Sequence, residues 1–168
     1  MPIFDSLNKG SSGIAPKGAL WEFTQGHKTD PVGIVSVGSH VLYRLDYCSV
    51  KRWCYAPPDG SRHCAIISGP GSSISQTVVF DEGDYTISFD RLLKGGKPAP
   101  GLRLMLDGRV LLALEGTPVK EPSWKRHTSP IFTVTAGLHA IEFSHDGQGE
   151  RGPHNLIDSV TINHMKKQ

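Results

Sequence analysis

Residues 73–89, SISQTVVFDEGDYTISF, carry apolar residues at every second position on both sides of an acidic turn. The alternating residues are Val78 and Phe80 before the turn, and Tyr85, Ile87 and Phe89 after it. A period of two predicts strands with one buried face. The turn, D-E-G-D, contains Gly83, which can adopt a positive φ. The stretch therefore predicts two strands joined by a tight turn.

Residues 131–143, IFTVTAGLHAIEF, repeat this pattern about fifty residues later. Gly137 aligns with Gly83, and three alternating positions follow each glycine in the same order, with His139, Ile141 and Phe143 in the second copy. Two matched hairpins predict two corners of one antiparallel β-sandwich.

Shorter stretches predict the remaining strands, at 2–4, 19–23, 33–45 with a break at Gly38, 62–68, 102–106, 109–114 and 155–163. Asp107-Gly108 between two apolar runs predicts a type I′ hairpin turn. The polar segment 115–128 predicts a connection that carries Trp124. About nine or ten strands without an amphipathic helix, together with 19 Gly and 12 Pro, predict an all-β antiparallel sandwich or jelly roll.

Length and charge narrow the class of protein further. A chain of 168 residues is long enough for one core, so we expect a single domain over 1–168. The formal charge of +2 and the scattered basic residues argue against nucleic-acid binding. No run of 18 apolar residues is present, which predicts no membrane span, and the first twenty residues do not have the pattern of a signal peptide. A mature or excised piece of a secreted protein remains compatible with this pattern.

The three cysteines are Cys48, Cys54 and Cys64. An odd number disfavours a full disulfide framework. Cys48 and Cys54 flank a short loop and could pair in an oxidising compartment, with Cys64 buried in the strand HCAIIS. The alternative is three small, partly buried thiols.

Eight short motifs follow one another along the chain in a familiar order: F-D, W-E-F, P-D-G-S, S-I-S-Q-T-V, G-D-Y-T-I-S-F, L-M-L-D-G, F-T-V-T-A-G-L-H-A-I-E-F and L-I-D-S-V-T-I. This succession, from Phe4 to Ile162, resembles the galactose-binding-domain-like jelly rolls. The resemblance implies a non-catalytic carbohydrate-binding module of a bacterial exported protein. Its partners would be a polysaccharide or oligosaccharide and a neighbouring catalytic domain, and its location would be extracellular or on the cell surface.

Members of that superfamily often hold a structural Ca²⁺ between acids of the first and last strands. The resemblance implies Asp5 and Asp158 as the corresponding ligands here. Calcium binds six to eight oxygens, so the loop after Asp5 would have to contribute. Alternatively, Asp5 caps a turn and Asp158 accepts backbone N–H bonds.

The candidate ligand-binding residues are aromatic side chains on predicted loops, because flat rings cover the apolar face of a sugar. The best such group is Trp53 and Tyr55 with Arg52, Tyr47 and Asp46, in the irregular segment 46–59. Trp124 is either a lid on the sandwich end or a second binding platform. Trp21 alternates with Phe23 and is interpreted as core.

Further polar candidates flank the loops 94–100 and 146–154, either beside the aromatic segment or at the opposite end. They are interpreted mainly as solvated loop residues and comprise Arg91, Lys94, Asp146, Glu150, Arg151, His154 and Asn155.

Two other functions stay open. A structural or protein-interaction sandwich predicts an exposed apolar patch in place of a polar groove. A small β-sandwich enzyme acting on glycans requires two carboxylates, or a His with a metal or nucleophile, in one cleft. The sequence has no H-E-x-x-H, C-x-x-C or G-x-S-x-G motif, and the spacing of His63 and the cysteines fits no common zinc site, so we expect no enzyme.

Overall fold

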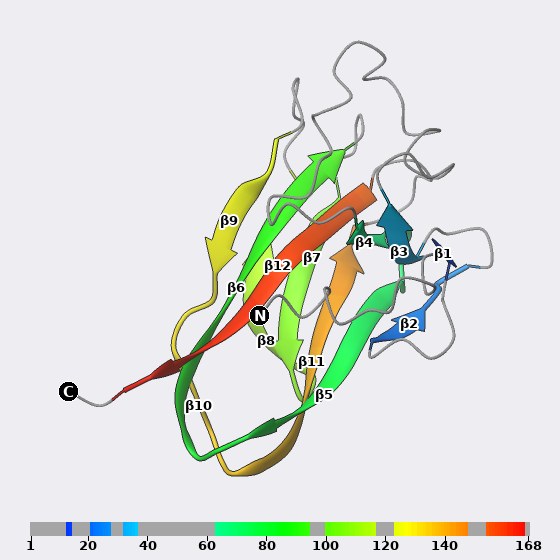
Figure 1. Cartoon of the computed structure of the whole chain (residues 1–168). Coiled ribbons are helices and arrows are strands. Elements are labelled where there is room, and N and C mark those ends of the chain that lie inside the picture. The colour runs from blue at the N-terminus through cyan, green and yellow to red at the C-terminus, as the bar shows by residue number, and fades with distance from the viewer. Residues whose placement is uncertain are drawn as a thin grey trace.

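A computed structural model describes residues 13–14, 21–27, 32–36, 63–94, 100–116, 123–147 and 154–166. In these segments the chain forms twelve strands and no helix (Figure 1). The strands are β1 (Gly13–Ile14), β2 (Glu22–Thr24), β3 (Val32–Ser36), β4 (His63–Ile67), β5 (Ser73–Phe80), β6 (Gly83–Lys94), β7 (Gly101–Leu106), β8 (Arg109–Leu114), β9 (Lys125–Thr128), β10 (Phe132–Val134), β11 (Gly137–Asp146) and β12 (His154–Met165).

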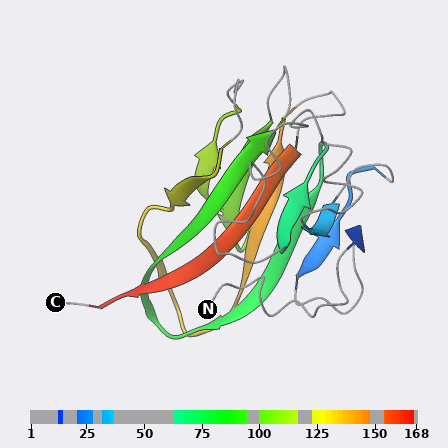
Figure 2. The same cartoon turned by 45° about the horizontal axis from the view of Figure 1, so that its top comes forward.

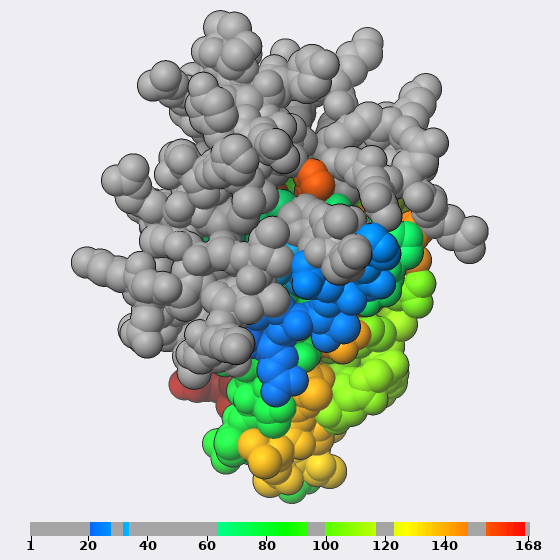
Figure 3. Space-filling view, turned by 90° about the vertical axis from the view of Figure 1, so that its right-hand side faces the viewer, coloured from blue at the N-terminus to red at the C-terminus, as the bar shows by residue number. Residues whose placement is uncertain are grey.

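The strands form two antiparallel sheets that face each other across a core (Figures 1 and 2). Sheet A has the order β1-β3-β4-β12-β6-β10, and β9 also pairs with β6. Sheet B has the order β2-β5-β11-β7-β8. The space-filling view shows β2, β5, β11 and the β7–β8 hairpin in this order across sheet B (Figure 3). This arrangement confirms the predicted antiparallel β-sandwich.

The two repeated stretches are not hairpins, because each one crosses between the sheets. β5 lies in sheet B and β6 in sheet A, while β10 lies in sheet A and β11 in sheet B. Each strand of one copy pairs instead with the other copy: Phe80 is opposite Gly137, and Gly83 is opposite Val134. The predicted corners are confirmed, but the predicted pairing within each copy is wrong. Alternation cannot distinguish the two cases, since both put the apolar residues on the core.

Gly83 also has a different role from the one expected. Its φ is not positive, whereas that of Gly137 is 139°. A Cβ at Gly83 would lie 2.6 Å from Nε2 of His164, whose ring stacks on Tyr85 with the ring centroids 4.6 Å apart. Glycine at this position therefore permits the close approach of the His164 ring, which a larger residue would displace, and does not serve a positive φ.

Large aromatic side chains join the two sheets in the core. Phe143 of sheet B packs edge-on against Phe89 of sheet A, with the ring centroids 5.0 Å apart, and lies 6.1 Å from Trp21. Phe89 and Phe143 are wholly buried, and Trp21 and Tyr85 nearly so. The core assignments of Trp21, Tyr85 and Phe89 are confirmed, as is the burial of Cys64 in β4. Cys48 and Cys54 lie outside the described residues.

β9 was predicted as part of a polar connection, and this prediction is wrong. Its sequence, KRHT, has no apolar residue to alternate, so it carries no periodic signal. It is a strand because it pairs with β6, from Ser88↔Thr128 to Arg91↔Lys125. None of the described residues belongs to a helix that is long and apolar enough to cross a membrane.

The β7–β8 turn has the geometry that its sequence predicts. Asp107 (φ 48°) and Gly108 (φ 79°) are both left-handed, as a type I′ turn requires. The Asp107 carboxylate accepts a 2.8 Å bond from the Ala140 amide and lies 2.6 Å from Nδ1 of His139. Nε2 of His139 lies 2.9 Å from the Thr135 carbonyl oxygen. Both acceptors are satisfied together only by the imidazolium, so the contact with Asp107, and then that with Thr135, raises the pKa of His139.

We expect the imidazole of His139 to titrate above the usual range in a histidine NMR titration, and Asp107→Asn to lower that pKa toward its ordinary value. A raised histidine pKa stabilises the fold below its unfolded value, about 6.5, and this contribution disappears as the pH rises through the folded value. The pKa of Asp107 is lowered chiefly by its contact with His139. The contribution of Asp107 to the stability of the fold is therefore lost as the pH falls below about 3.9. The contact is therefore most stabilising between about pH 4 and 6.5.

Asp84→Asn is the control, because Asp84 contacts Thr133 and not His139. An unchanged His139 titration in Asp107→Asn would contradict the assignment.

Candidate functional site

Most of the predicted site residues fall outside the part of the chain that the structure describes. These are the four aromatic-loop residues Tyr47, Arg52, Trp53 and Tyr55, and the calcium ligand Asp5. Their roles stay predictions. Trp124 and Asp158 are described: Trp124 directly precedes β9, and Asp158 lies on β12, both strands of sheet A.

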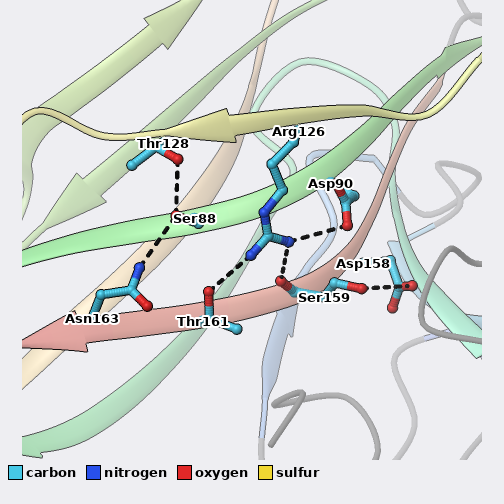
Figure 4. Close-up of polar contacts among 8 residues, drawn as sticks. All are labelled: Ser88, Asp90, Arg126, Thr128, Asp158, Ser159, Thr161 and Asn163. Atoms are coloured by element: carbon cyan, nitrogen blue, oxygen red, sulfur yellow. Dashed lines mark hydrogen bonds and ion pairs between the residues drawn. The ribbon is translucent and has the colours of Figure 1, made fainter.

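The outer face of sheet A carries a row of polar side chains across β9, β6 and β12 (Figure 4). It arises because alternate residues of β6 point away from the core: Ile87 and Phe89 are buried inside, while Ser88 and Asp90 are on the other side. Cross-strand neighbours share a face, so β9 and β12 extend the row. The members of this polar face are Ser88, Asp90, Arg126, Thr128, Ser159, Thr161 and Asn163.

Arg126 links the three strands of the polar face. Its Nη1 donates to Asp90 Oδ2 at 3.1 Å and to the Ser159 carbonyl oxygen at 2.9 Å, and its Nη2 donates to Thr161 Oγ1 at 3.0 Å (Figure 4). Its side chain nevertheless remains 45% exposed. The guanidinium is thus held in place by three hydrogen bonds, while nearly half of the side chain stays accessible to solvent.

The hydroxyl groups beside it form a second set of bonds. Ser88 Oγ lies 2.9 Å from Thr128 Oγ1, and Asn163 Nδ2 donates to Ser88 Oγ at 3.3 Å. Donors and acceptors therefore lie on neighbouring strands about 4.8 Å apart. Thr128 and Asn163 are exposed and can offer hydrogen bonds to a ligand, whereas Ser88 is buried between them.

Asp158 lies at a bulge between β12 and β6. The strand register shifts between Asp158 and Thr161, and Ser159 has a φ of 50°. Asp158 is wholly buried and is the cross-strand partner of Asp90. The described residues contain no group of three or more His, Cys, Asp or Glu that could hold a metal. Two carboxylates alone do not supply the six to eight oxygens of a calcium site, so the pairing with Asp5 stays a prediction.

Trp124 precedes β9 and is half-buried, with its indole Nε1 shielded from solvent. Within the described residues this N–H has no hydrogen-bond acceptor. Ser123 and Lys125, on either side of it, line a pocket, whereas Trp124 does not. Its role as lid or platform stays a prediction.

This pocket lies on the opposite side of β9 from the polar face and is called the basic pocket here. It has a volume of about 150 Å³. It opens where β6, the end of β8 and the start of β9 meet, and is lined by Arg91, Leu93, Leu114, Glu115, Ser123, Lys125 and His127.

The loops with polar candidates both leave the sandwich at this end. Lys94 is opposite His154, and Gly101 is opposite Asp146. The interpretation of these candidates as solvated is wrong for Arg91, His154 and Asn155, which are all buried. Arg91 lies near the end of β6, and His154 and Asn155 are the first residues of β12. The sandwich encloses all three at these strand ends.

Arg91 is the central polar group at this end. Its Nε donates to Asn155 Oδ1 at 2.7 Å, its Nη2 to the Pro100 carbonyl at 2.7 Å and its Nη1 to the Glu115 carbonyl at 3.4 Å. Burial lowers the pKa of Arg91 to about 10. The guanidinium stays charged at neutral pH and joins strand ends of both sheets.

Sequence reasoning did not find the polar face or the basic pocket as sites. The signal for the polar face was present in T-I-S-F-D-R of β6, where polar residues alternate with core residues. The partners on β9 and β12 could not be identified from it, because strand pairing between distant segments is not visible in the periodicity.

No protein-family model matches the sequence, and no curated protein matches it. Solved structures do match. The carbohydrate-binding module TmCBM61 in complex with β-1,4-galactotriose is 17% identical with a TM-score of 0.59, covering 92% of this chain and 100% of that chain. The K2 cleaved adhesin domain of Lys-gingipain is 12% identical with a TM-score of 0.63, covering 95% of this chain and 96% of the other. A CBM36 module in complex with calcium and xylotriose is 13% identical with a TM-score of 0.47, covering 59% and 79%.

At these identities the similarity shows the fold. The chain is a β-sandwich of the kind found in carbohydrate-binding modules, and the predicted resemblance is confirmed at that level.

Proposed function

We propose that this chain is a non-catalytic carbohydrate-binding module that holds an attached or partner enzyme near a glycan. The observation that carries the proposal is the polar face, where an exposed but fixed Arg126 lies in a row of hydroxyl and amide groups. Neutral sugars are recognised by such convergent donors and acceptors together with a flat ring. Trp124, next to β9, is our candidate for that ring, together with Trp53 and Tyr55.

Support also comes from the fold. The structural match to TmCBM61, which was solved in complex with β-1,4-galactotriose, extends over 92% of this chain. The further parts of the proposal are an extracellular or cell-surface location in a bacterium and a structural calcium bound with the help of Asp5 and Asp158.

The test is a glycan and polysaccharide binding screen on the purified chain, with calcium and with a chelator. We expect saturable binding to one glycan class, weakened about tenfold or more by Arg126→Ala, because hydrogen bonds to a charged donor contribute about 1.5–3 kcal/mol each. Trp124→Ala and Trp53→Ala test the aromatic contacts in the same titration. Loss of binding or a lower Tm in the chelator would support the calcium.

Arg103→Ala is a matched control for Arg126→Ala. Arg103 is 44% exposed and also bonds a carboxylate, that of Asp146 at 2.6 Å, but it lies on sheet B. Equal effects of the two substitutions would remove the polar face as the site. A folded sample that binds no glycan would contradict the proposed function.

A second candidate function, protein interaction, is favoured by one observation. At the end of the sandwich where each repeated stretch crosses between the sheets, the cross-strand partners Val79 and Leu138 are 72% and 69% exposed. Contiguous exposed apolar side chains are typical of interaction surfaces. Val79→Ser with Leu138→Ser would leave glycan binding unchanged under the first function, and would abolish capture of a protein partner under the second.

A further inference from the structure

Arg91 carries a buried positive charge, and each hydrogen-bond partner that the structure gives it among the described residues is neutral. The residue is 6% exposed, and its side chain donates to one amide oxygen and two backbone carbonyls. A guanidinium has five N–H groups. Two of these N–H groups, one on Nη1 and one on Nη2, have no acceptor among the described residues. Arg91 also lines the basic pocket. A desolvated cation without an anion is costly, so this arrangement is one that a bound anion would stabilise.

The walls of the basic pocket add to this charge. Lys125 and His127 line it from β9, opposite Arg91 and Phe89 of β6. The pKa of His127 is lowered by burial and then by the charges of Arg91 and Lys125. Asp90, on the other side of β6, acts in the opposite direction but is bound to Arg126.

Glu115 is the one carboxylate among the described residues that line the pocket. Its side chain is exposed, and within the described part of the chain it forms no ion pair. It contributes its backbone oxygen to Arg91 instead. The described walls therefore hold two permanent cations against one acid.

The shape of the basic pocket limits what can enter. Its volume of about 150 Å³ suits a small group and not a whole chain of sugars. Leu93 and Leu114 supply apolar wall. β9 separates the pocket from the polar face by the width of one strand, with Arg126 and Thr128 on one side and Lys125 and His127 on the other.

We propose that the basic pocket binds the anionic substituent, a carboxylate or a sulfate ester, of a glycan that lies along the polar face, with Arg91 and Lys125 as its donors. The planar guanidinium matches the two oxygens of such groups. The inference rests on the proposed function and names the class of glycan, namely an acidic one.

The experiment is calorimetric titration with four probes: oligogalacturonate, its methyl ester, a sulfated galacto-oligosaccharide and its desulfated form. We expect at least one acidic probe to bind roughly tenfold more tightly than its neutral counterpart. The pair that shows this preference identifies carboxylate or sulfate as the group bound. The preference should decrease as the salt concentration rises.

Two variants test the site itself. Lys125→Gln changes an exposed side chain and should reduce the preference several-fold without unfolding the protein. Arg91→Lys keeps the charge and removes the planar fork, and its folding is checked by thermal melting. Arg109→Gln is the matched control: it removes an exposed cation at the opposite end of β8 and should change nothing.

Equal affinity for charged and neutral probes would overturn the acidic-glycan inference and leave the proposed function standing. An acidic preference that survives both Lys125→Gln and Arg91→Lys would overturn the pocket as its source. Failure of all four probes to bind, together with a negative glycan screen, would overturn the inference and the proposed function together.

Discussion

We expect Phe143→Ala to lower the free energy of unfolding by about 3–5 kcal/mol, the range for truncating a buried Phe. Phe143 is wholly buried and its ring contacts those of Phe89 and Trp21, so it joins sheet B to sheet A and to the residue that precedes β2. Neither neighbour can fill the space without leaving its own contacts. Urea denaturation followed by tryptophan fluorescence measures the change, and Tm should decrease by about 10 °C for a chain of this size.

Leu138→Ala is the control on the same strand. Leu138 also lies on β11 but is 69% exposed, so its truncation should change the stability by no more than about 0.5 kcal/mol. Similar losses in the two variants would mean that Phe143 is not part of a tightly packed core.

The sandwich itself could be predicted because apolar and polar residues alternate along the strands that form its core. Phe89 and Phe143 occupy matching positions of the two repeated stretches, and both lie at the centre of the core. The pairing of those stretches could not be predicted. A hairpin within one sheet and a β-arch, in which the chain crosses from one sheet to the other, bury the same alternating residues. Only the strand pairing distinguishes them, here the pairs Gly83 with Val134 and Phe80 with Gly137.

The candidate site was less predictable, because its residues come from segments distant in sequence. Arg126 stands in a strand without apolar residues, and its partners Asp90 and Thr161 are 36 and 35 residues away. Arg91 is polar and close to a Gly-rich loop, which is typical of a solvated residue. Its burial follows from the meeting of four strand ends, and local composition does not encode that meeting.

We expect Asn155→Leu to lower the free energy of unfolding by about 2–4 kcal/mol, since it leaves buried polar groups without partners. Asn155 is wholly buried in β12, accepts from Nε of Arg91 at 2.7 Å and donates to the Gly101 carbonyl oxygen at 3.1 Å. Leucine has a similar volume, so the loss would come from the Arg91 and Gly101 groups and not from a cavity. Urea denaturation of the variant measures it.

Asn155→Asp separates the two contributions. A carboxylate still accepts from Arg91 and neutralises its charge, and only the bond to Gly101 is lost. The free energy of unfolding should therefore decrease by only about 1–2 kcal/mol. An Asp variant less stable than the Leu variant would contradict the view of Arg91 as a cation that lacks an anion. The new carboxylate would also take the place of an external one, so Asn155→Asp should weaken binding of an acidic glycan and leave that of its neutral counterpart unchanged. One substitution thus links the stability of this end of the sandwich to its selectivity.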